Sequence, residues 1–187
     1  MSYSDGASLA TGSTYFYRVY AYKTGAPNSG YSNESSANVP VPAGLTYLSD
    51  LSFTTIANGW GPAEKDRSNG ETGATDGRTI TLNGVAYAKG LGVHAASNIL
   101  FNLNGQYSKF FSDIGIDDEV NGGSVVFQVF ADDVMIFQSG TMLASSATQT
   151  INGLNIAGVQ QLRLVVTNAG DGANFDHADW AGARVST

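Results

Sequence analysis

Residues 125–130, Val-Val-Phe-Gln-Val-Phe, decide the fold of this 187-residue chain. The first, third and fifth side chains of this stretch are apolar and point to one face of an extended strand, because successive side chains alternate in a β-strand. The run Phe110–Ile116 is similarly apolar, and the Asn83-Gly84 pair between two short apolar runs is typical of a tight hairpin turn. No stretch of ten or more residues has a helical period. The chain is therefore predicted to be all-β.

Further runs rich in β-branched and aromatic residues lie on both sides of this stretch, separated by turn residues. From Tyr47 onward they predict additional strands at Leu51–Phe53, Thr79–Leu82, Val85–Tyr87, Leu91–His94, Ile99–Leu103, Val134–Gln138, Thr148–Ile151, Leu162–Thr167 and Trp180–Val185. A long polar loop is expected from Thr54 to Arg78. About ten short strands joined by turns favour a β-sandwich of the jelly-roll type.

The composition excludes several function classes. The net charge is −7 and only 9 residues are Lys or Arg, which argues against binding to nucleic acid or to an anionic membrane surface. The chain has no cysteine, so disulfides and thiolate chemistry are absent. No apolar run is long enough to cross a membrane, and no signal peptide is visible in the polar first residues. We interpret Met1 as a start added to an excised fragment.

Acidic residues gather in three loops. Asn168–Trp180 combines three carboxylates with asparagine, histidine and tryptophan, directly after an apolar strand. Asp117-Asp118-Glu119 and the segment Glu64–Glu71 repeat the pattern. Oxygen ligands on flexible loops suit calcium, which takes six to eight of them, and they also suit sugar hydroxyls. Solvated loops or capped turns are the simpler alternatives.

Two side chains near these loops suit sugar binding. Trp60 stands between glycines, where it would either stack on a sugar or cover the bottom of the sandwich. His94 would either bind a hydroxyl or serve as a structural residue of its strand. Asp117 and Glu119 are expected to point outward at a strand end.

Catalysis is disfavoured. A carboxylate pair on short loops lacks the enclosing cleft that glycoside hydrolysis needs. Asp176-His177 has no activated serine nearby, and two histidines in the chain do not make a zinc site.

Residues 1–40 resemble the C-terminal half of a fibronectin type III domain. The resemblance rests on Leu9–Ala21 and Gly30–Asn33, with Tyr15 at the tyrosine-corner position of that fold. A linker at residues 41–46 is expected to follow. So short a piece cannot bury both faces of a sandwich, and we expect it to be loosely ordered or to pack on a neighbouring molecule through its edges, which would make a dimer.

The remainder, residues 47–187, resembles family 51 carbohydrate-binding modules, also called NPCBM domains. The agreeing stretches are Tyr47–Asp50, Gly59–Pro62, Glu64–Gly70, Lys89–Ala95, Gly115–Glu119, Gly170–Gly172 and Asp176–Trp180. The resemblance implies a galactose-binding-like sandwich that binds terminal galactose or related glycans without catalysis and holds a structural calcium. It also implies a covalently linked catalytic domain in a secreted bacterial glycoside hydrolase, or attachment to a surface protein.

Carried onto this sequence, the resemblance implies two sets of residues. Calcium would be held by Asp66, Asn69 and Asp179. The sugar would stack on Trp60, and its hydroxyls would be bound by Glu64, His94, Asp117 and Asp118, with Asn174 and Asp176 at the rim. The rival hypotheses are a ligand-free structural spacer, and a small glycosidase using Asp117, Glu119 and Asp176.

Overall fold

The computed structural model describes residues 14–38 and 44–187, and its contacts divide the chain into two units, Met1–Val41 and Pro42–Thr187. In the first unit, strand β1 (Thr14–Tyr17) pairs antiparallel with β2 (Ser35–Asn38). The aromatic run Tyr15–Tyr22 would by its composition predict a longer strand than β1. Beyond the ladder, the hydroxyls of Ser32 and Ser29 accept hydrogen bonds from the backbone amides of Val19 and Ala21, so side chains replace the regular ladder there. The likeness to a fibronectin domain stays a prediction.

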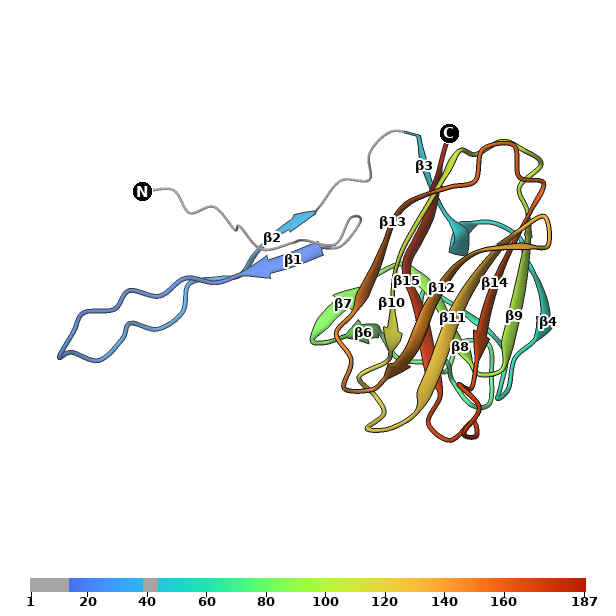
Figure 1. Cartoon of the computed structure of the whole chain (residues 1–187). Helices are drawn as coiled ribbons and strands as arrows, with labels where there is room; N and C mark the ends of the chain where they lie inside the picture. Colours follow the sequence, from blue (N-terminus) through green and yellow to red (C-terminus); the bar gives the residue numbers. More distant parts are fainter. Residues whose placement is uncertain (1–13, 39–43) are drawn as a thin grey trace. The chain divides into compact units, whose positions relative to one another are not determined.

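The second unit is a sandwich of two antiparallel sheets, as predicted (Figure 1). The first sheet has the spatial order β13 (Gln149–Asn155), β10 (Lys109–Ile116), β15 (His177–Ser186), β8 (Gly90–His94) and β5 (Glu64–Lys65), with β3 (Leu45–Tyr47) paired to the end of β15. The second sheet has the order β12 (Val134–Leu143), β11 (Ser124–Ala131), β14 (Gln161–Thr167), β9 (Ser97–Asn102) and β4 (Thr54–Ala57). A hairpin of β6 (Ile80–Leu82) and β7 (Val85–Tyr87) and one 3-10 turn, η1 (Leu48–Asp50), complete it. Among the described residues no helix could span a membrane.

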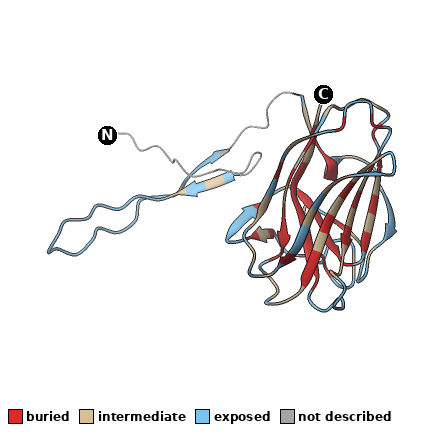
Figure 2. Cartoon of the chain, viewed as in Figure 1, coloured by how far each residue is buried: buried red, intermediate tan, exposed pale blue. Residues whose placement is uncertain are grey.

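The core lies between the two sheets, and Figure 2 shows the buried residues concentrated along their strands. The alternation in β11 is confirmed, because Val125, Phe127 and Val129 are all completely buried. Trp180 of β15 is also completely buried, and its ring meets the edge of Phe127 with centroids 5.0 Å apart. Apolar burial of this kind is the main stabilising contribution to the fold.

Three sequence expectations were wrong in detail. Leu51–Phe53 lies outside any strand, between η1 and β4. The expected long loop contains β4 and β5, which lie at the outer ends of the two sheets, and β4 is exposed along its length, so it has no apolar alternation to find. The expected linker, residues 41–46, lies partly outside the described residues, and Leu45 already belongs to β3.

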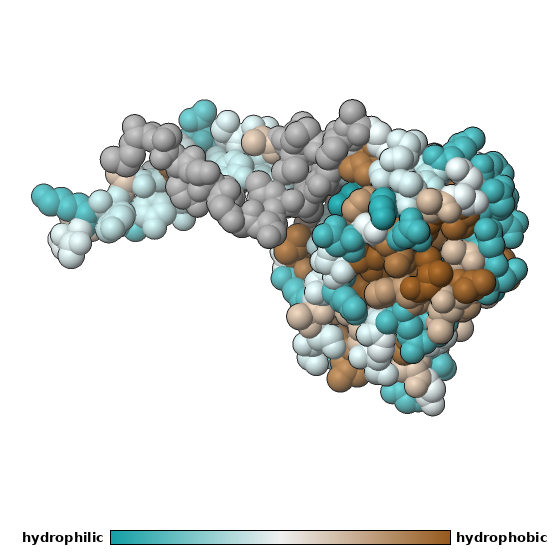
Figure 3. All heavy atoms as spheres, turned by 45° about the horizontal axis from the view of Figure 1, so that its top comes forward, coloured by the Kyte–Doolittle hydropathy of each residue, from teal (hydrophilic) through white to brown (hydrophobic). Residues whose placement is uncertain are grey.

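The surface of the second unit is mixed, and Figure 3 shows an apolar area framed by hydrophilic residues on the face in view. Over the whole second unit, the exposed large apolar side chains include Ile56, Trp60, Val85, Val134, Met135, Leu143 and Phe175. Two of these, Trp60 and Phe175, are aromatic and stand on loops, where a packing role in the core does not explain them.

Candidate functional site

Four loops meet at one end of the sandwich, the lower end in Figure 1. They are residues 58–63, 95–96, 117–123 and 168–176, and they follow or precede strands that are neighbours in the two sheets. The segment after β5 also folds back over the first sheet. A side chain on Gly92 of β8 would overlap the backbone of Arg67 and Ser68, so this segment lies directly on the strand.

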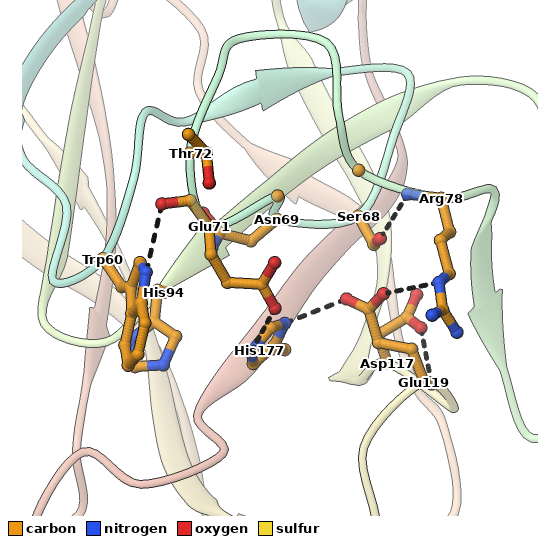
Figure 4. Close-up of polar contacts among 12 residues, drawn as sticks. Trp60, Ser68, Asn69, Glu71, Thr72, Arg78, His94, Asp117, Glu119 and His177 are labelled. Atoms are coloured by element: carbon orange, nitrogen blue, oxygen red, sulfur yellow. Dashed lines mark hydrogen bonds and ion pairs between the residues drawn. The ribbon is translucent and has the colours of Figure 1, made fainter.

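An aromatic row marks the middle of this end (Figure 4). Trp60 is 56% exposed, and its indole nitrogen donates a hydrogen bond to the carbonyl of Glu71 at 3.0 Å. Its ring centroid lies 6.0 Å from that of His94, which in turn lies 5.1 Å from that of His177. The tryptophan is thus fixed in orientation and still accessible from solvent.

The two histidines have opposite protonation tendencies. His94 is buried, and Nδ1 donates to the carbonyl of Ala95 at 2.9 Å, because a carbonyl can only accept. Burial lowers the pKa of His94 below its usual 6.5, so the ring is neutral and Nε2 is an acceptor. The Glu119 carboxylate, 2.9 Å from Nδ1 of His177, raises the pKa of that histidine. The site therefore combines an acceptor, Nε2 of His94, with a histidine whose protonated form is favoured by Glu119.

A polar surface hollow of about 200 Å³ lies beside this row. Its lining residues come from the folded-back segment, the 117–123 loop and β15: Asn69, Gly70, Glu71, Asp76, Gly77, Arg78, Glu119, Val120 and His177. Carboxylates of Glu71 and Glu119 lie on either side of His177, with Oε1 of Glu71 4.0 Å from Nε2. This arrangement of acceptors around a donor suits the hydroxyls of a sugar.

Asn58, which was not among the predicted site residues, connects several parts of the site. Its amide nitrogen donates to the carbonyls of Trp60 and Gly61 and to the side-chain oxygen of Asn69, and its oxygen accepts from the backbone amide of His94. The Trp60 loop is therefore tied to β8 and to the hollow. Asparagine before a glycine is a turn signal that would have pointed to this residue.

Two of the residues expected to bind calcium or sugar, Glu64 and Asp66, make hydrogen bonds that hold the folded-back segment. Glu64 is completely buried, and its Oε1 accepts from the backbone amides of Gly70 and Gly77. Asp66 binds the ammonium of Lys89 at 2.9 Å and the backbone amide of Gly90. A glycan therefore has no access to Glu64, and the charge of Asp66 is already neutralised by Lys89.

Asp117 and Asp118 anchor the β6–β7 hairpin. Asp117 accepts from the backbone amides of Thr81 and Glu119, and Asp118 accepts from those of Asn83 and Gly84. Asp117 was expected to point outward and does leave the core, but the hairpin and the preceding segment cover it, so only 2% of it is exposed.

Asp179 is completely buried, and within residues 14–38 and 44–187 neither of its carboxylate oxygens has a hydrogen-bond partner. Burial, followed by the neighbouring Asp117 carboxylate, raises the pKa of Asp179 well above 3.8. A charged carboxylate is very costly in a protein interior, so folding favours the protonated form of Asp179. Of the three residues expected to bind calcium, Asp66 binds Lys89, Asn69 accepts a hydrogen bond from Asn58, and Asp179 is buried close to Asp117.

We expect Asp179→Asn to make stability less dependent on pH. A pKa raised on folding contributes stability below the unfolded-state value near 3.8, and that contribution is lost as pH rises through the folded-state value. The asparagine keeps a donor for Asp117 at every pH, so the variant should gain stability relative to the wild type as pH rises. Urea unfolding at several pH values measures this, and a constant difference would contradict the raised pKa of Asp179.

Asn174 and Asp176 lie together at a second hollow. Asn174 is exposed, whereas Asp176 is only 1% exposed and its Oδ1 accepts from the backbone amide of Ser124 at 2.9 Å. Both line a hollow of about 260 Å³ together with Asp171 and Leu143. The structure thus brings Trp60, Asn69 and His94 to the first hollow or its edge, and the two expected rim residues to the second.

Comparisons with known proteins agree with the fold. The NPCBM/NEW2 domain family matches residues 44–186. A candidate endo-alpha-N-acetylgalactosaminidase of Renibacterium salmoninarum is 42% identical over 146 residues, which cover 76% of this chain and 10% of that protein. The chain therefore spans about a tenth of the length of this curated relative.

Two solved structures are similar. CBM51 from Clostridium perfringens GH95, in complex with methyl-galactose, is 34% identical with a TM-score of 0.68, covering 76% of this chain and 99% of that one. CBM51-2 with the INT domains of Clostridium perfringens ZmpB, in complex with GlcNAc, is 27% identical with a TM-score of 0.68, covering 95% of this chain and 38% of that one.

Proposed function

The chain belongs to the NPCBM/NEW2 domain family, and we propose that the hollow beside Trp60 binds the terminal sugar of a neutral, galactose-containing glycan without breaking any bond. The observation that carries this proposal is the exposed Trp60 ring, held by its hydrogen bond to Glu71, a residue that lines the polar hollow. The apolar face of galactose would stack on the indole. Its hydroxyls would be bound by Glu71, by Glu119 and by the ring nitrogens of the two histidines.

The similarity to a module solved with methyl-galactose supports this choice of sugar. An open hollow with one stacking ring and a few hydrogen bonds should give a weak site, with a dissociation constant of roughly 10⁻⁵ to 10⁻³ M. Weak sites of this kind act by raising the effective concentration of a linked domain near its substrate. We therefore infer that the module belongs to a larger secreted or surface protein, and that the catalytic domain lies in another part of that protein.

A glycan array tests the function directly. Galactose-terminated neutral glycans should bind, and a catalytically competent site should be absent, so chromogenic galactosides should stay intact on long incubation. An array without signal in the presence and absence of calcium would instead favour a structural spacer, and turnover lost on Asp117→Ala would favour an enzyme.

Calcium is a separate part of the proposal. Within the segment 64–78, the carboxylates of Glu64 and Asp76 fit the ion better than the expected set of Asp66, Asn69 and Asp179. Glu64 Oε2 is buried without a partner, and a side chain on Gly70 would overlap carboxylate oxygens of both Asp76 and Glu64, so the two carboxylates converge there. Burial, opposed by two amide bonds and reinforced by Asp76, raises the pKa of Glu64. Glu64 and Asp76 would hold the ion with a backbone carbonyl such as that of Ser68, since calcium prefers hard oxygen ligands.

Chelation should lower the melting temperature if this assignment is right. A metal that binds only the native state at about 100 times its dissociation constant contributes about 2.7 kcal/mol, or about 5–10 °C for a unit of this size. Asp76→Asn should remove most of that shift, whereas Asp133→Asn in the distant β11–β12 turn should keep it. Melting curves with calcium and with chelator measure both, and superimposable wild-type curves would exclude the ion.

A further inference from the structure

The second hollow has features that the proposed function leaves unused. It lies at the same end of the sandwich as the first and has a volume of about 260 Å³. Leu143 supplies an apolar wall and is 49% exposed, and Ser124, Asp171, Asn174 and Asp176 supply polar groups. A small apolar surface next to several acceptors is the composition that a sugar ring requires, since its C–H face is apolar and its edge carries hydroxyls.

Its polar groups are held in place but have free bonding capacity. Asp176 is 1% exposed, and its Oδ2 has no hydrogen-bond partner in the described part of the chain. Both oxygens of Asp171 accept from the Ser124 hydroxyl, at 2.6 and 2.7 Å, which orients the carboxylate while leaving lone pairs open. A buried acceptor without a donor is costly, so a ligand hydroxyl that reaches it would gain more than it would in water.

Phe175 stands between the residues of the two hollows. It is 61% exposed and has a φ of 65°, a conformation that a bulky side chain rarely adopts. A side chain on Gly122 would come within 3.3 Å of the Phe175 ring, so the glycine backbone supports one side of the ring and leaves the rest open. Strain of this kind at an exposed aromatic residue points to a binding role.

The chain around Phe175 links the two hollows. Asn174 and Asp176 on either side of it line the second hollow, and His177, whose amide donates to the Phe175 carbonyl at 2.9 Å, lines the first. On the facing loop, Val120 lines the first hollow and Gly123 lines the second, with the supporting Gly122 between them. The exposed ring therefore lies against Gly122, on the stretch of chain that joins residues of the two hollows, and is accessible to a glycan that extends from one hollow to the other.

The charge of this surface limits the ligand. Among the described residues no Lys or Arg lines the second hollow, and Arg78 is the one such residue at the first, against the carboxylates of Glu71, Asp76 and Glu119. Like charges brought close together repel, so a sialylated or sulfated sugar would be disfavoured in either hollow. Neutral hexoses and N-acetylhexosamines meet no such barrier.

We propose that the second hollow is a subsite for the sugar that precedes the terminal one, with Phe175 as its stacking platform and with Asn174, Asp176 and Asp171 binding its hydroxyls. The inference rests on the proposed function, because it assigns the terminal sugar to the hollow beside Trp60. The module then binds a neutral oligosaccharide in preference to a single sugar. A neutral sugar that occupies the second hollow strengthens binding.

Calorimetric titration of the whole chain with methyl galactoside and with neutral galactose-terminated di- and trisaccharides tests the subsite. The wild type should bind the longer ligands about tenfold more tightly, corresponding to about one good stacking contact. Phe175→Ala should abolish this gain and leave the affinity for methyl galactoside unchanged, and Phe175→Tyr should retain the gain. Met135→Ala, on the exposed part of β12, serves as the control and should behave as the wild type.

Other outcomes overturn the proposal in distinguishable ways. Equal wild-type affinities for short and long ligands would exclude the subsite and leave the terminal-sugar site intact. An equal loss for all ligands in Phe175→Ala would place the ring in the first site. Loss of calcium-dependent stabilisation in Asp171→Asn, with oligosaccharide binding unchanged, would make the hollow a cation site. A wild type that binds no glycan would reject the proposed function together with the subsite.

Discussion

Trp60→Ala should weaken binding of a galactose-terminated glycan by about ten- to a hundredfold, equivalent to about 1.4–2.8 kcal/mol. The indole is the large apolar surface beside the first hollow, and its orientation is already fixed by the bond to Glu71, so little ordering entropy is lost when a sugar stacks on it. Because the side chain is 56% exposed, the free energy of unfolding should change by only about 0.5 kcal/mol.

Two further variants separate stacking from loop positioning. Trp60→Phe keeps an aromatic face but loses the indole donor to Glu71, so its affinity should fall between those of the wild type and Trp60→Ala. Val134→Ala removes another exposed apolar side chain, in β12, and should leave binding unchanged. Calorimetric titration with urea unfolding on the same samples gives both quantities. Undiminished binding by Trp60→Ala would show that the sugar does not stack there.

The sandwich itself could be predicted because its core strands carry a clear alternation. Val125, Phe127 and Val129 all point inward, as the sequence indicates. The same logic failed for Asp117, because alternation separates the core face from the other face but does not show what covers the other face. Gly92 and Gly115, which flank Asp179 on neighbouring strands, mark where the covering segments approach the sheet. Glycines inside strands were the signal for this close approach.

The sequence indicated which residue types gather near the candidate site, but not which of these residues contact one another. The rings of Trp60 and His94, both predicted to bind sugar, lie 6.0 Å apart between centroids. The pairing of His177 with Glu119 joins residues 58 positions apart, and one sequence contains no information on such distances. The acidic loops were predicted to bind a ligand, but Glu64, Asp66 and Asp118 are occupied by backbone amides or lysine. The local sequence pattern does not show which carboxylates form hydrogen bonds within the protein and which stay available to a ligand.

Trp180→Ala should destabilise the second unit by about 3–5 kcal/mol, the cost of removing a large aromatic side chain from a packed core. Trp180 is completely buried at the centre of β15, between Phe110 and Phe127, and the collapse of neighbouring strands around the cavity would be incomplete. Trp180→Phe should cost less, partly because it also removes an indole nitrogen that has no hydrogen-bond partner among the residues the structure describes.

The two tryptophans therefore form a matched pair with opposite expected effects. Trp60→Ala should lose affinity at nearly constant stability, and Trp180→Ala should lose stability while its folded fraction still binds the glycan. Binding measured well below the melting temperature, with the folded fraction obtained from urea unfolding, separates the two. If Trp180→Ala stayed folded but lost affinity as strongly as Trp60→Ala, the end of β15 that carries His177 would depend on the core, and the site could not be treated as preformed loops on a rigid sandwich.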